Sequence, residues 1–459
     1  MNPVKFQPVI GLEIHVELKT KSKMFCQCSA DYFGQKPNTI VCPVCLGLPG
    51  ALPVPNRRAV EWTILIGQAL NCRINQRSKF DRKHYFYPDL PKGYQISQYD
   101  EPIASRGWLK LKTQNSKLKT KEIEKKFRIH RVHLEEDTGK LIHKQGDTLI
   151  DFNRSGVPLV EIVTEPDFDN AEDVKAFLEE LHTIIRYLGV SDANMEEGSM
   201  RLEPNISIKV ESRKSKVESN DLPKYKVEVK NINSFRFVKQ AIEYELERQQ
   251  ELLKKGETPI QETRGFDEKK VQTYSQRSKE QAHDYRYFPE PDIPPMEFSN
   301  EEIERIKKML PVLPSSKYEQ LRLQYKLNEP TSHHLTHNIS NLKKFEGSVS
   351  LIQKDPDLMK IPNINQGTAN IIINKTQNQN LSPSQIVDLT RATYLPKETN
   401  HSLLSEVINK VILNNPKAVE DYKNGKQNSI MFLIGQVMKQ MKGKTDAMVV
   451  KKALENELT

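Results

Sequence analysis

Polar residues alternate with apolar ones near the start of the chain, from Val9 to Leu18. This alternation predicts a β-strand, in which successive side chains point to opposite faces of the sheet. Glu13, His15 and Glu17 would then lie on one face, about 7 Å apart at each step of two residues. Such a row can hold a divalent cation and, through it, phosphate oxygens. A half-exposed strand without a ligand shows the same pattern, so both interpretations stay open.

Four of the five cysteines fall between positions 26 and 45, in two close pairs. Cys26 is paired with Cys28, and Cys42 with Cys45. Four thiolates in two pairs are the ligand set of a tetrahedral structural zinc site, which leaves no open position for catalysis. The spacer of the first pair is tighter than usual, and four ordinary reduced cysteines are the alternative. We predict structural Zn²⁺, because such clustering is specific in a chain poor in cysteine.

Two further strand-like stretches carry acids. Glu135 and Glu136 end an alternating run, and Glu228 lies in another. If these strands and the first one faced a single cavity, their carboxylates would form one cation and phosphate site. The sequence contains no Walker loop and no dinucleotide fingerprint, so ATP would need a cradle of another kind.

The segment 81–98 combines aromatic, charged and turn residues, a mixture typical of an ordered loop that lines a site. Base stacking or phosphate contact is one interpretation, and a surface loop with packed tyrosines is the other. Asn153 and Arg154 precede Gly156 in a turn and form a candidate anion clamp. A turn with an exposed arginine is the alternative there.

Length and composition indicate a folded protein of two to four domains, with 459 residues, 37% hydrophobic and 28% charged. The net charge of +9 permits a polyanionic partner such as nucleic acid without requiring one. No apolar run is long enough for a membrane span, and the first residues lack the apolar region of a signal peptide. We therefore expect a cytoplasmic protein that does not use a membrane.

Strand patterns dominate the first part of the chain, and helical patterns dominate the rest. Asp169 and Glu172 are a candidate capping box for the clearest helix of the first part, which Gly189 should end. The proline-rich segment 284–295 marks the end of an α+β domain. Apolar periodicity predicts helices over 169–188, 234–253, 299–309, 317–325 and 430–441.

Eight stretches carry a more specific signal. Two of them read Val-Ile-Gly-Leu-Glu-Ile-His-Val-Glu-Leu and Tyr-Pro-Asp-Leu-Pro-Lys-Gly-Tyr-Gln-Ile-Ser-Gln. In order and along nearly the whole chain, the eight resemble the B subunit family of the glutamine-dependent aspartyl/glutamyl-tRNA amidotransferase. They lie at 9–18, 42–50, 87–98, 133–140, 151–167, 229–235, 284–292 and 432–439.

The resemblance implies a three-part architecture. A cradle-shaped, mainly antiparallel α+β catalytic domain with flanking helices would span 1–295, an all-α helical domain 296–385, and a small helical tail that binds tRNA 386–459. The resemblance also implies a heterotrimer. One partner would be an amidase subunit that releases ammonia from glutamine, and the other a small subunit that clamps the two together.

The implied reaction is an ATP-dependent ligation. The side-chain carboxylate of Glu on tRNA(Gln), or of Asp on tRNA(Asn), is phosphorylated, and ammonia displaces the phosphate to form the amide. Making an acyl phosphate brings ATP oxygens and a carboxylate together, so Mg²⁺ and acidic ligands are needed between them. A non-catalytic tRNA-binding module on the same fold is the alternative. A stand-alone amidase is opposed by the lack of a nucleophile constellation.

The resemblance also assigns residues. Glu13 and His15 match the family's metal and phosphate site, and we add Glu135, Glu136 and Glu228 as catalytic acids. Magnesium is assigned to Glu13, His15 and Glu136, and the four cysteines match the metal-carrying form of the family. The residues expected near the aminoacyl end or the phosphate are Tyr87, Lys92, Tyr94, Gln95, Ser97, Asn153 and Arg154. The sequence departs from the family pattern at Leu202, Glu203 and Phe266.

Overall fold

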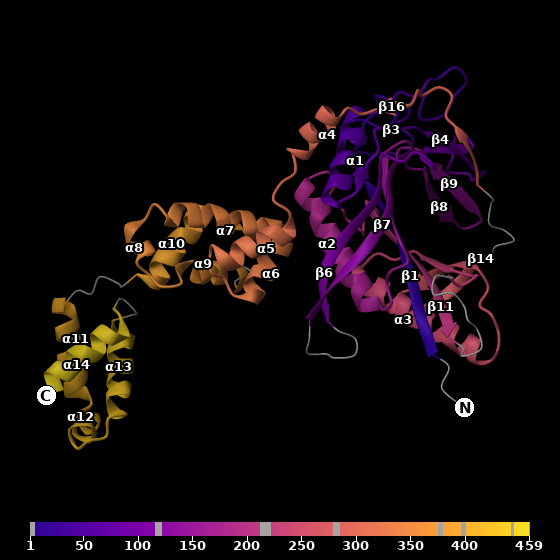
Figure 1. Ribbon diagram of the computed structural model, residues 1–459. Coiled ribbons are helices and arrows are strands. Elements are labelled where there is room, and N and C mark those ends of the chain that lie inside the picture. Colours follow the sequence, from indigo (N-terminus) through magenta and orange to yellow (C-terminus); the bar gives the residue numbers. More distant parts are fainter. Residues whose placement is uncertain are drawn as a thin grey trace. The chain divides into compact units, whose positions relative to one another are not determined.

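The computed structural model describes residues 5–114, 122–211, 222–278, 285–374, 380–395, 401–441 and 445–458 (Figure 1). The chain divides into two compact units, Met1–Pro314 and Ser315–Thr459. None of the described helices is both long enough and apolar enough to cross a membrane.

The first unit is built on strands. They are β1 (Lys5–Glu17), β2 (Arg73–Ile74), β3 (Arg77–Ser78), β4 (Asp81–His84), β5 (Tyr94–Ser97), β6 (Ala104–Gln114), β7 (Glu122–Glu136), β8 (Lys140–Lys144), β9 (Asp147–Asp151), β10 (Pro158–Thr164), β11 (Met200–Glu211), β12 (Val227–Lys230), β13 (Glu262–Asp267), β14 (Gln272–Ser278), β15 (Arg286–Pro289) and β16 (Met296–Glu297).

Among the described residues, the main sheet has nine strands in the order β14-β13-β12-β11-β1-β10-β7-β6-β2. All neighbours in it are antiparallel except β12 and β13, which are parallel. A small sheet, β15-β4-β5, joins strands that are distant in sequence. The prediction of a mainly antiparallel α+β domain is confirmed.

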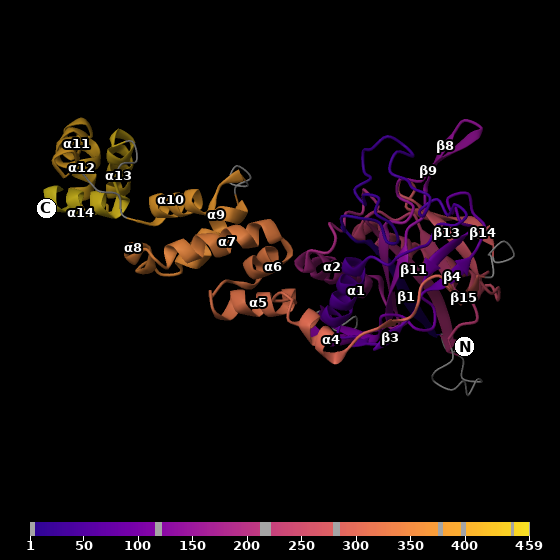
Figure 2. The same ribbon diagram turned by 90° about the horizontal axis from the view of Figure 1, so that it is seen from above.

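Helices cover one face of the main sheet, as Figures 1 and 2 show. Helix α1 (Arg57–Ala69) packs on β6 and β7, α2 (Ala171–Leu188) on β6, and α3 (Phe235–Lys254) on β11 and β14. Leu12, Ile14 and Val16 of β1 point to this side and are at most 1% exposed. Their alternation with polar residues is therefore the reason that β1 has one apolar face and one polar face. The helices of this unit are α1 (Arg57–Ala69), α2 (Ala171–Leu188), α3 (Phe235–Lys254) and α4 (Asn300–Lys307).

The α2 helix begins and ends for local reasons. The side chain of Asn170 accepts a hydrogen bond from the Asp173 N–H, and Gly189 ends the helix in the left-handed conformation with φ 67°. The predicted stop at Gly189 is confirmed. The predicted capping box of Asp169 and Glu172 is wrong, because the cap lies one residue later at Asn170.

The second unit is helical, and its described part contains two separate apolar clusters. One lies between Ile352 and Ile364, with Val387 and Leu395 packed against it. The other runs from Leu404 to Leu458. The helices are α5 (Pro314–Leu323), α6 (Glu329–His337), α7 (Ile339–Ile352), α8 (Pro356–Met359), α9 (Ile364–Asn374), α10 (Pro383–Tyr394), α11 (His401–Asn414), α12 (Pro416–Lys423), α13 (Ser429–Gln440) and α14 (Ala447–Leu458).

The predicted domain boundaries at residues 295 and 385 can be compared with the strand pairing and helix packing. Strand β16 pairs with β3, and α4 packs on α1, so residues 296–307 belong to the first compact unit. Residue 386 falls inside α10, which packs on α7 and α9. The separate tail core starts at Leu404. The three-part division itself stays a prediction.

Candidate active site and cysteine cluster

The polar face of the main sheet gathers ionisable side chains from five neighbouring strands. In the antiparallel register, His15 of β1 lies opposite Glu161 of β10, and Glu161 lies opposite His133 of β7. On the other side of β1, Glu13 lies opposite Glu203 of β11. Directly opposed residues have Cβ atoms about 5 Å apart, so this register brings together acids from distant parts of the chain.

We call His15, His133, Glu135 and Glu161 the histidine cluster. His15 Nε2 lies 3.7 Å from Glu161 Oε2 and 3.8 Å from Glu135 Oε1. His133 Nε2 lies 3.0 Å from the same Glu161 oxygen. One ligand atom from each of His15, Glu135 and Glu161 falls within 4.8 Å of the others, so these three residues could hold a metal ion.

Charge in the histidine cluster is balanced by its imidazoles. Burial lowers the pKa of His15, but the hydrogen bond and charge of Glu161, with further charge from Glu203 and Glu135, outweigh burial and raise the pKa to about 9. The pKa of Glu161 lies well below its ordinary value, because His133 and His15 outweigh the effect of burial. The cluster thus holds imidazolium between carboxylates when no other cation is bound.

We call Glu13, Glu203 and Glu228 the carboxylate cluster. Their oxygens also lie within 4.8 Å of one another. Lys230 Nζ is 2.9 Å from Glu203 and 3.4 Å from Glu228, and Asn205 donates to Glu13 at 2.9 Å. This cluster offers oxygen ligands only, which is the donor set that Mg²⁺ prefers.

The acids of the carboxylate cluster differ in their pKa. Burial tends to raise the pKa of Glu203, but the charges of Lys230 and His15 outweigh it and lower the pKa to about 2. Burial raises the pKa of Glu228. A pocket of about 340 Å³ opens at Glu13 and is also lined by Tyr225 and Lys226.

Glu17, the third residue of the predicted row, meets a different group. Burial and the nearby Asp137 carboxylate raise the pKa of Glu17 to about 8. Burial also acts on Asp137, but the charges of Arg154 and Arg201 outweigh it and lower its pKa. Tyr32 donates to Glu17 at 3.1 Å, and Arg201 lies 2.5 Å from Asp137. One proton shared between two carboxyl groups accounts for the opposite shifts.

The predicted magnesium set of Glu13, His15 and Glu136 is not brought together. Glu13 belongs to the carboxylate cluster and His15 to the histidine cluster. Glu136 follows Glu135 directly, so its side chain leaves the strand on the other face. Its carboxylate lies 2.7 Å from Lys92 Nζ and accepts the Ile96 N–H at 2.9 Å. Glu136 is therefore a correction to the predicted metal ligands.

The residues predicted to bind substrate fall into two groups. Ser97 of β5 donates to Glu135 at 2.9 Å and so reaches the histidine cluster. Lys92, Tyr94 and Gln95 instead make contacts within the protein. Tyr87 is exposed on the β4–β5 loop. Lys92 pairs with Glu136, Tyr94 lies under the Arg82 guanidinium, and Gln95 donates to the Glu136 carbonyl.

The two side chains of the predicted anion clamp form hydrogen bonds within the protein. Asn153 is fully buried, accepts the Ile40 N–H at 2.8 Å and donates to the Lys36 carbonyl at 2.7 Å. Arg154 donates to the carbonyls of Thr138 and Gly139. Both side chains therefore hold loops in place, and Arg154 is partly buried rather than the exposed arginine of the alternative.

Sequence reasoning missed Glu161, His133 and Glu203 as members of the site. Glu161 is a single acid in an otherwise apolar strand from Pro158 to Thr164, and this was the available signal. Glu203 was noted only as a departure, and the structure places it in the carboxylate cluster. The other two departures are accommodated in the core, where Leu202 is 2% exposed and Phe266 packs near Phe237.

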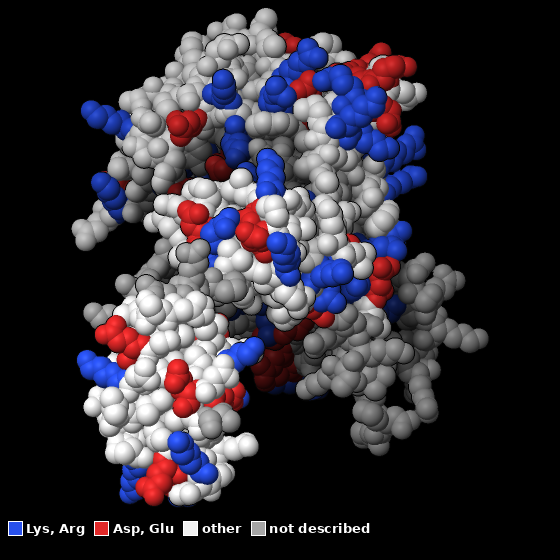
Figure 3. Space-filling view, turned by 90° about the vertical axis from the view of Figure 1, so that its left-hand side faces the viewer, with Lys and Arg blue, Asp and Glu red and all other residues white. Residues whose placement is uncertain are grey.

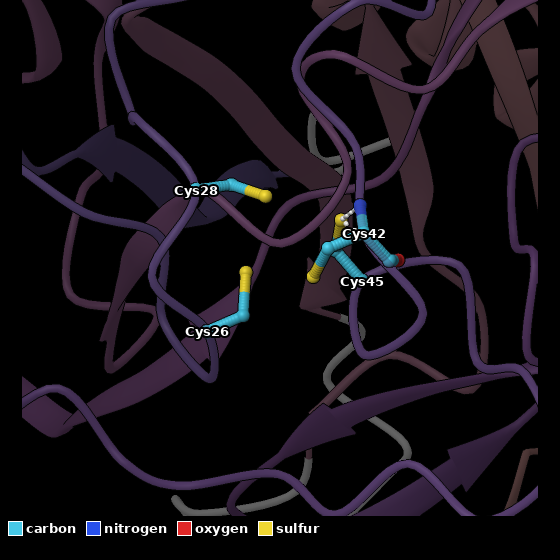
Figure 4. Close-up of side chains that lie close together, drawn as sticks. All are labelled: Cys26, Cys28, Cys42 and Cys45. Carbon is cyan, nitrogen blue, oxygen red and sulfur yellow. Dashed lines mark hydrogen bonds between the residues drawn. The ribbon is translucent and has the colours of Figure 1, made fainter.

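The four cysteine sulfurs point toward a common centre (Figure 4). All four sulfur atoms lie within 4.8 Å of one another. The Cys42 N–H donates to Cys45 Sγ at 3.1 Å. A hydrogen bond from Cys26 is the largest of the effects that lower the pKa of Cys45 to about 4, with burial opposing it. This donor set and spacing fit a tetrahedral metal ion with four sulfur ligands.

Charge does not by itself mark a binding surface on the face shown in Figure 3. Lysine and arginine side chains are interspersed there with aspartate and glutamate.

Comparisons with known proteins define the class of the chain. Residues 8–304 match the model of the GatB/GatE catalytic domain, and residues 341–458 match that of the GatB domain. The first match covers the main sheet with both clusters and all four cysteines.

Curated relatives agree over nearly full length. A protein of Thermosipho melanesiensis, named as the B subunit of aspartyl/glutamyl-tRNA(Asn/Gln) amidotransferase, is 44% identical over 97% of this chain and 97% of its own. Proteins of the same name from Thermotoga maritima and Persephonella marina are 43% and 42% identical, over 99% of this chain and 100% of theirs. The chain belongs to the B subunit family of the aspartyl/glutamyl-tRNA(Asn/Gln) amidotransferases.

Proposed function

We propose that this chain is the subunit that activates and amidates the amino acid on mischarged tRNA. It uses ATP to phosphorylate the side-chain carboxylate of Glu-tRNA(Gln) or Asp-tRNA(Asn). Ammonia from a partner amidase subunit then displaces the phosphate and gives the amide. The relatives carry the name of a tRNA amidotransferase subunit, and the matched family model is a catalytic domain.

One observation carries the catalytic part of this proposal: two acidic clusters lie two residues apart on β1, at Glu13 and His15. In the first step a substrate carboxylate oxygen attacks the γ-phosphorus, and the bond to the β-phosphate oxygen breaks. Negative charge gathers on the phosphoryl oxygens. Mg²⁺, when bound, would supply positive charge that offsets it.

The two clusters divide the work in this proposal. Glu13, Glu203 and Glu228 would hold Mg²⁺ through carboxylate oxygens, and the pocket of about 340 Å³ beside Glu13 is of ligand size. His15, Glu135 and Glu161 form a second candidate divalent-cation group. Ser97 and His133 hold Glu135 and Glu161 in place for that role.

The four cysteines would hold a structural Zn²⁺ in the same unit. Four sulfur ligands leave no position open to substrate, so the ion's part is to fix the loop after β1. The chain would work in a cytoplasmic heterotrimer with the amidase subunit and a small clamping subunit.

The helix α13 supports a tRNA-binding role for the tail. Met431, Phe432, Gly435 and Lys439 form an exposed stripe along it. Apart from its chain neighbours and the backbone of its own helix, no heavy atom of the described chain lies within 4 Å of a Cβ built on Gly435, so tertiary packing there does not require glycine. A glycine in a helix costs about 1 kcal/mol relative to alanine. Close approach of a tRNA backbone to this stripe, with a phosphate at Lys439, accounts for the glycine.

The activity is tested in the assembled complex of this chain with its partner subunits. ATP-dependent formation of Gln-tRNA(Gln) and Asn-tRNA(Asn) is measured from each mischarged tRNA, for wild type and for Glu228→Gln. The variant should lose amide formation and keep tRNA binding, while Glu243→Gln on the exposed side of α3 should behave as wild type. Firm tRNA binding without ATP-dependent amide formation by the wild-type complex would favour the non-catalytic module instead.

The tail is tested separately with Gly435→Ala. The substitution should stabilise α13 by about 0.5–1 kcal/mol and yet weaken tRNA binding. Wild-type tRNA affinity in the more stable variant would refute the contact at Gly435. Lys423→Ala, on the exposed end of α12, serves as the matched control for a lost or altered surface residue.

A further inference from the structure

Lys23 is almost completely buried, although burial of its charged ammonium group is energetically unfavourable. Its side chain is 1% exposed and stands among the largest fully buried side chains of the described residues. An ammonium group removed from water needs an anion or a full set of hydrogen-bond acceptors. Yet the ion pairs found among the described residues include none between Lys23 and a carboxylate.

The contacts of Lys23 Nζ lead to the cysteine cluster. It donates to Cys45 Sγ at 3.7 Å, to the Ile40 carbonyl at 2.8 Å and to the Phe152 carbonyl at 3.4 Å. These three contacts use all three donors of the ammonium group. Two of the acceptors are neutral carbonyls, so the sulfur is the one hydrogen-bond acceptor of Lys23 that can carry a negative charge.

The charge of the proposed metal centre supplies what Lys23 lacks. Four thiolates around one Zn²⁺ leave two net negative charges, and the centre is partly buried. A buried ammonium in contact with one sulfur offsets part of that negative charge.

We propose that Lys23 is a positioning residue for the metal centre, which neutralises part of its charge and connects it to the 152–156 turn. This inference rests on the zinc site proposed above. The connection is short in space, because Nζ reaches both Cys45 Sγ and the Phe152 carbonyl. The same turn is held by a hydrogen bond from Ser155 Oγ to the Cys45 carbonyl at 3.3 Å. Metal binding at the cysteines is thereby coupled to the segment that leads into β10 and Glu161.

The test measures zinc affinity of the full-length chain by competition with a chromophoric chelator. Lys23→Met should weaken zinc binding by about 10- to 100-fold, as removal of groups next to metal ligands does. Lys23→Arg keeps the charge and should retain more zinc affinity than Lys23→Met. Lys21→Met, an exposed neighbour, should leave it unchanged. A folded Lys23→Met protein with wild-type zinc affinity overturns the proposal.

Two further measurements separate this role from simple scaffolding. Cobalt-substituted protein should show a shifted sulfur-to-cobalt charge-transfer band in Lys23→Gln, which keeps a donor without the charge; an unshifted band counts against the proposal. If the uncharged variants unfold while zinc-stripped wild type stays folded, Lys23 acts without the metal and the proposal fails. If wild-type protein purified with zinc present holds none, the zinc site itself is refuted.

Discussion

The histidine cluster and the carboxylate cluster start from neighbouring outward positions of one strand, yet they differ in chemistry. His15 lies between acids that it and His133 neutralise, in a buried setting. Glu13 lies with two other acids beside an open pocket, where Lys226 and Lys230 supply the positive charge. The residues opposite each position on the adjacent strands account for this difference. Strand pairing, more than the composition of β1, decides what each position can do.

Among substitutions on β1, the largest effect on the reaction rate is expected at Glu13. Glu13→Gln removes a carboxylate from the cluster that offers only oxygen ligands, and should lower the rate of ATP-dependent amide formation by roughly 100- to 1,000-fold. The affinity for tRNA should not change. Single-turnover assays with mischarged tRNA measure the rate. An unchanged rate would contradict the proposed catalytic role of the carboxylate cluster.

A smaller loss of activity is expected at Glu161. Glu161→Gln takes away the carboxylate that both imidazoles contact, so activity should fall by about 10- to 100-fold. In the metal-free protein the pKa of His15 should also fall from about 9 toward its ordinary value of 6.5. NMR titration of the histidines checks this shift. Glu165→Gln, which removes the partner of the exposed His130, should leave His15 unaffected.

Lys230 provides a test that applies to the carboxylate cluster alone. Lys230→Met leaves Glu203 and Glu228 without their ammonium partner and should destabilise the metal-free protein by about 1–2 kcal/mol. Added Mg²⁺ should then raise the melting temperature more in the variant than in wild type. Thermal unfolding with and without Mg²⁺ measures both effects. An equal Mg²⁺ response in the two proteins would argue against a cation among these acids.

The smallest effect concerns Glu17, which extends the row beyond both clusters. Its folded-state pKa of about 8 lies above the ordinary 4.5, so the stability contributed by its protonated form is complete below about pH 4.5 and is lost as the pH rises through about 8. Glu17→Gln removes this dependence. Urea unfolding at pH 6 and pH 9 should show a smaller decrease in stability for the variant, and an equal decrease would contradict the shared proton.

Local patterns predicted the elements well. The helices near 169–188 and 234–253 and the two faces of β1 follow from periodicity and end signals within a few residues. The strand register could not be predicted this way. Glu161 lies opposite His15 because β10 pairs with β1 across more than a hundred residues, and alternation carries no information on that pairing. The misassigned Glu136 is different, since its position next to Glu135 already placed it on the opposite face.

The central position of β1 has a consequence for how the protein is made. Its two neighbours, β10 and β11, lie at 158–164 and 200–211, so the N-terminal strand has no partner until about 150 residues have followed it and lacks its second partner until about 190 have. At about 5–20 residues per second, this leaves at least one backbone edge of β1 unpaired for roughly 10–40 s on the ribosome. Ribosome-bound chains halted before residue 200 should therefore bind chaperones through β1, and the acidic site forms only when that interval ends.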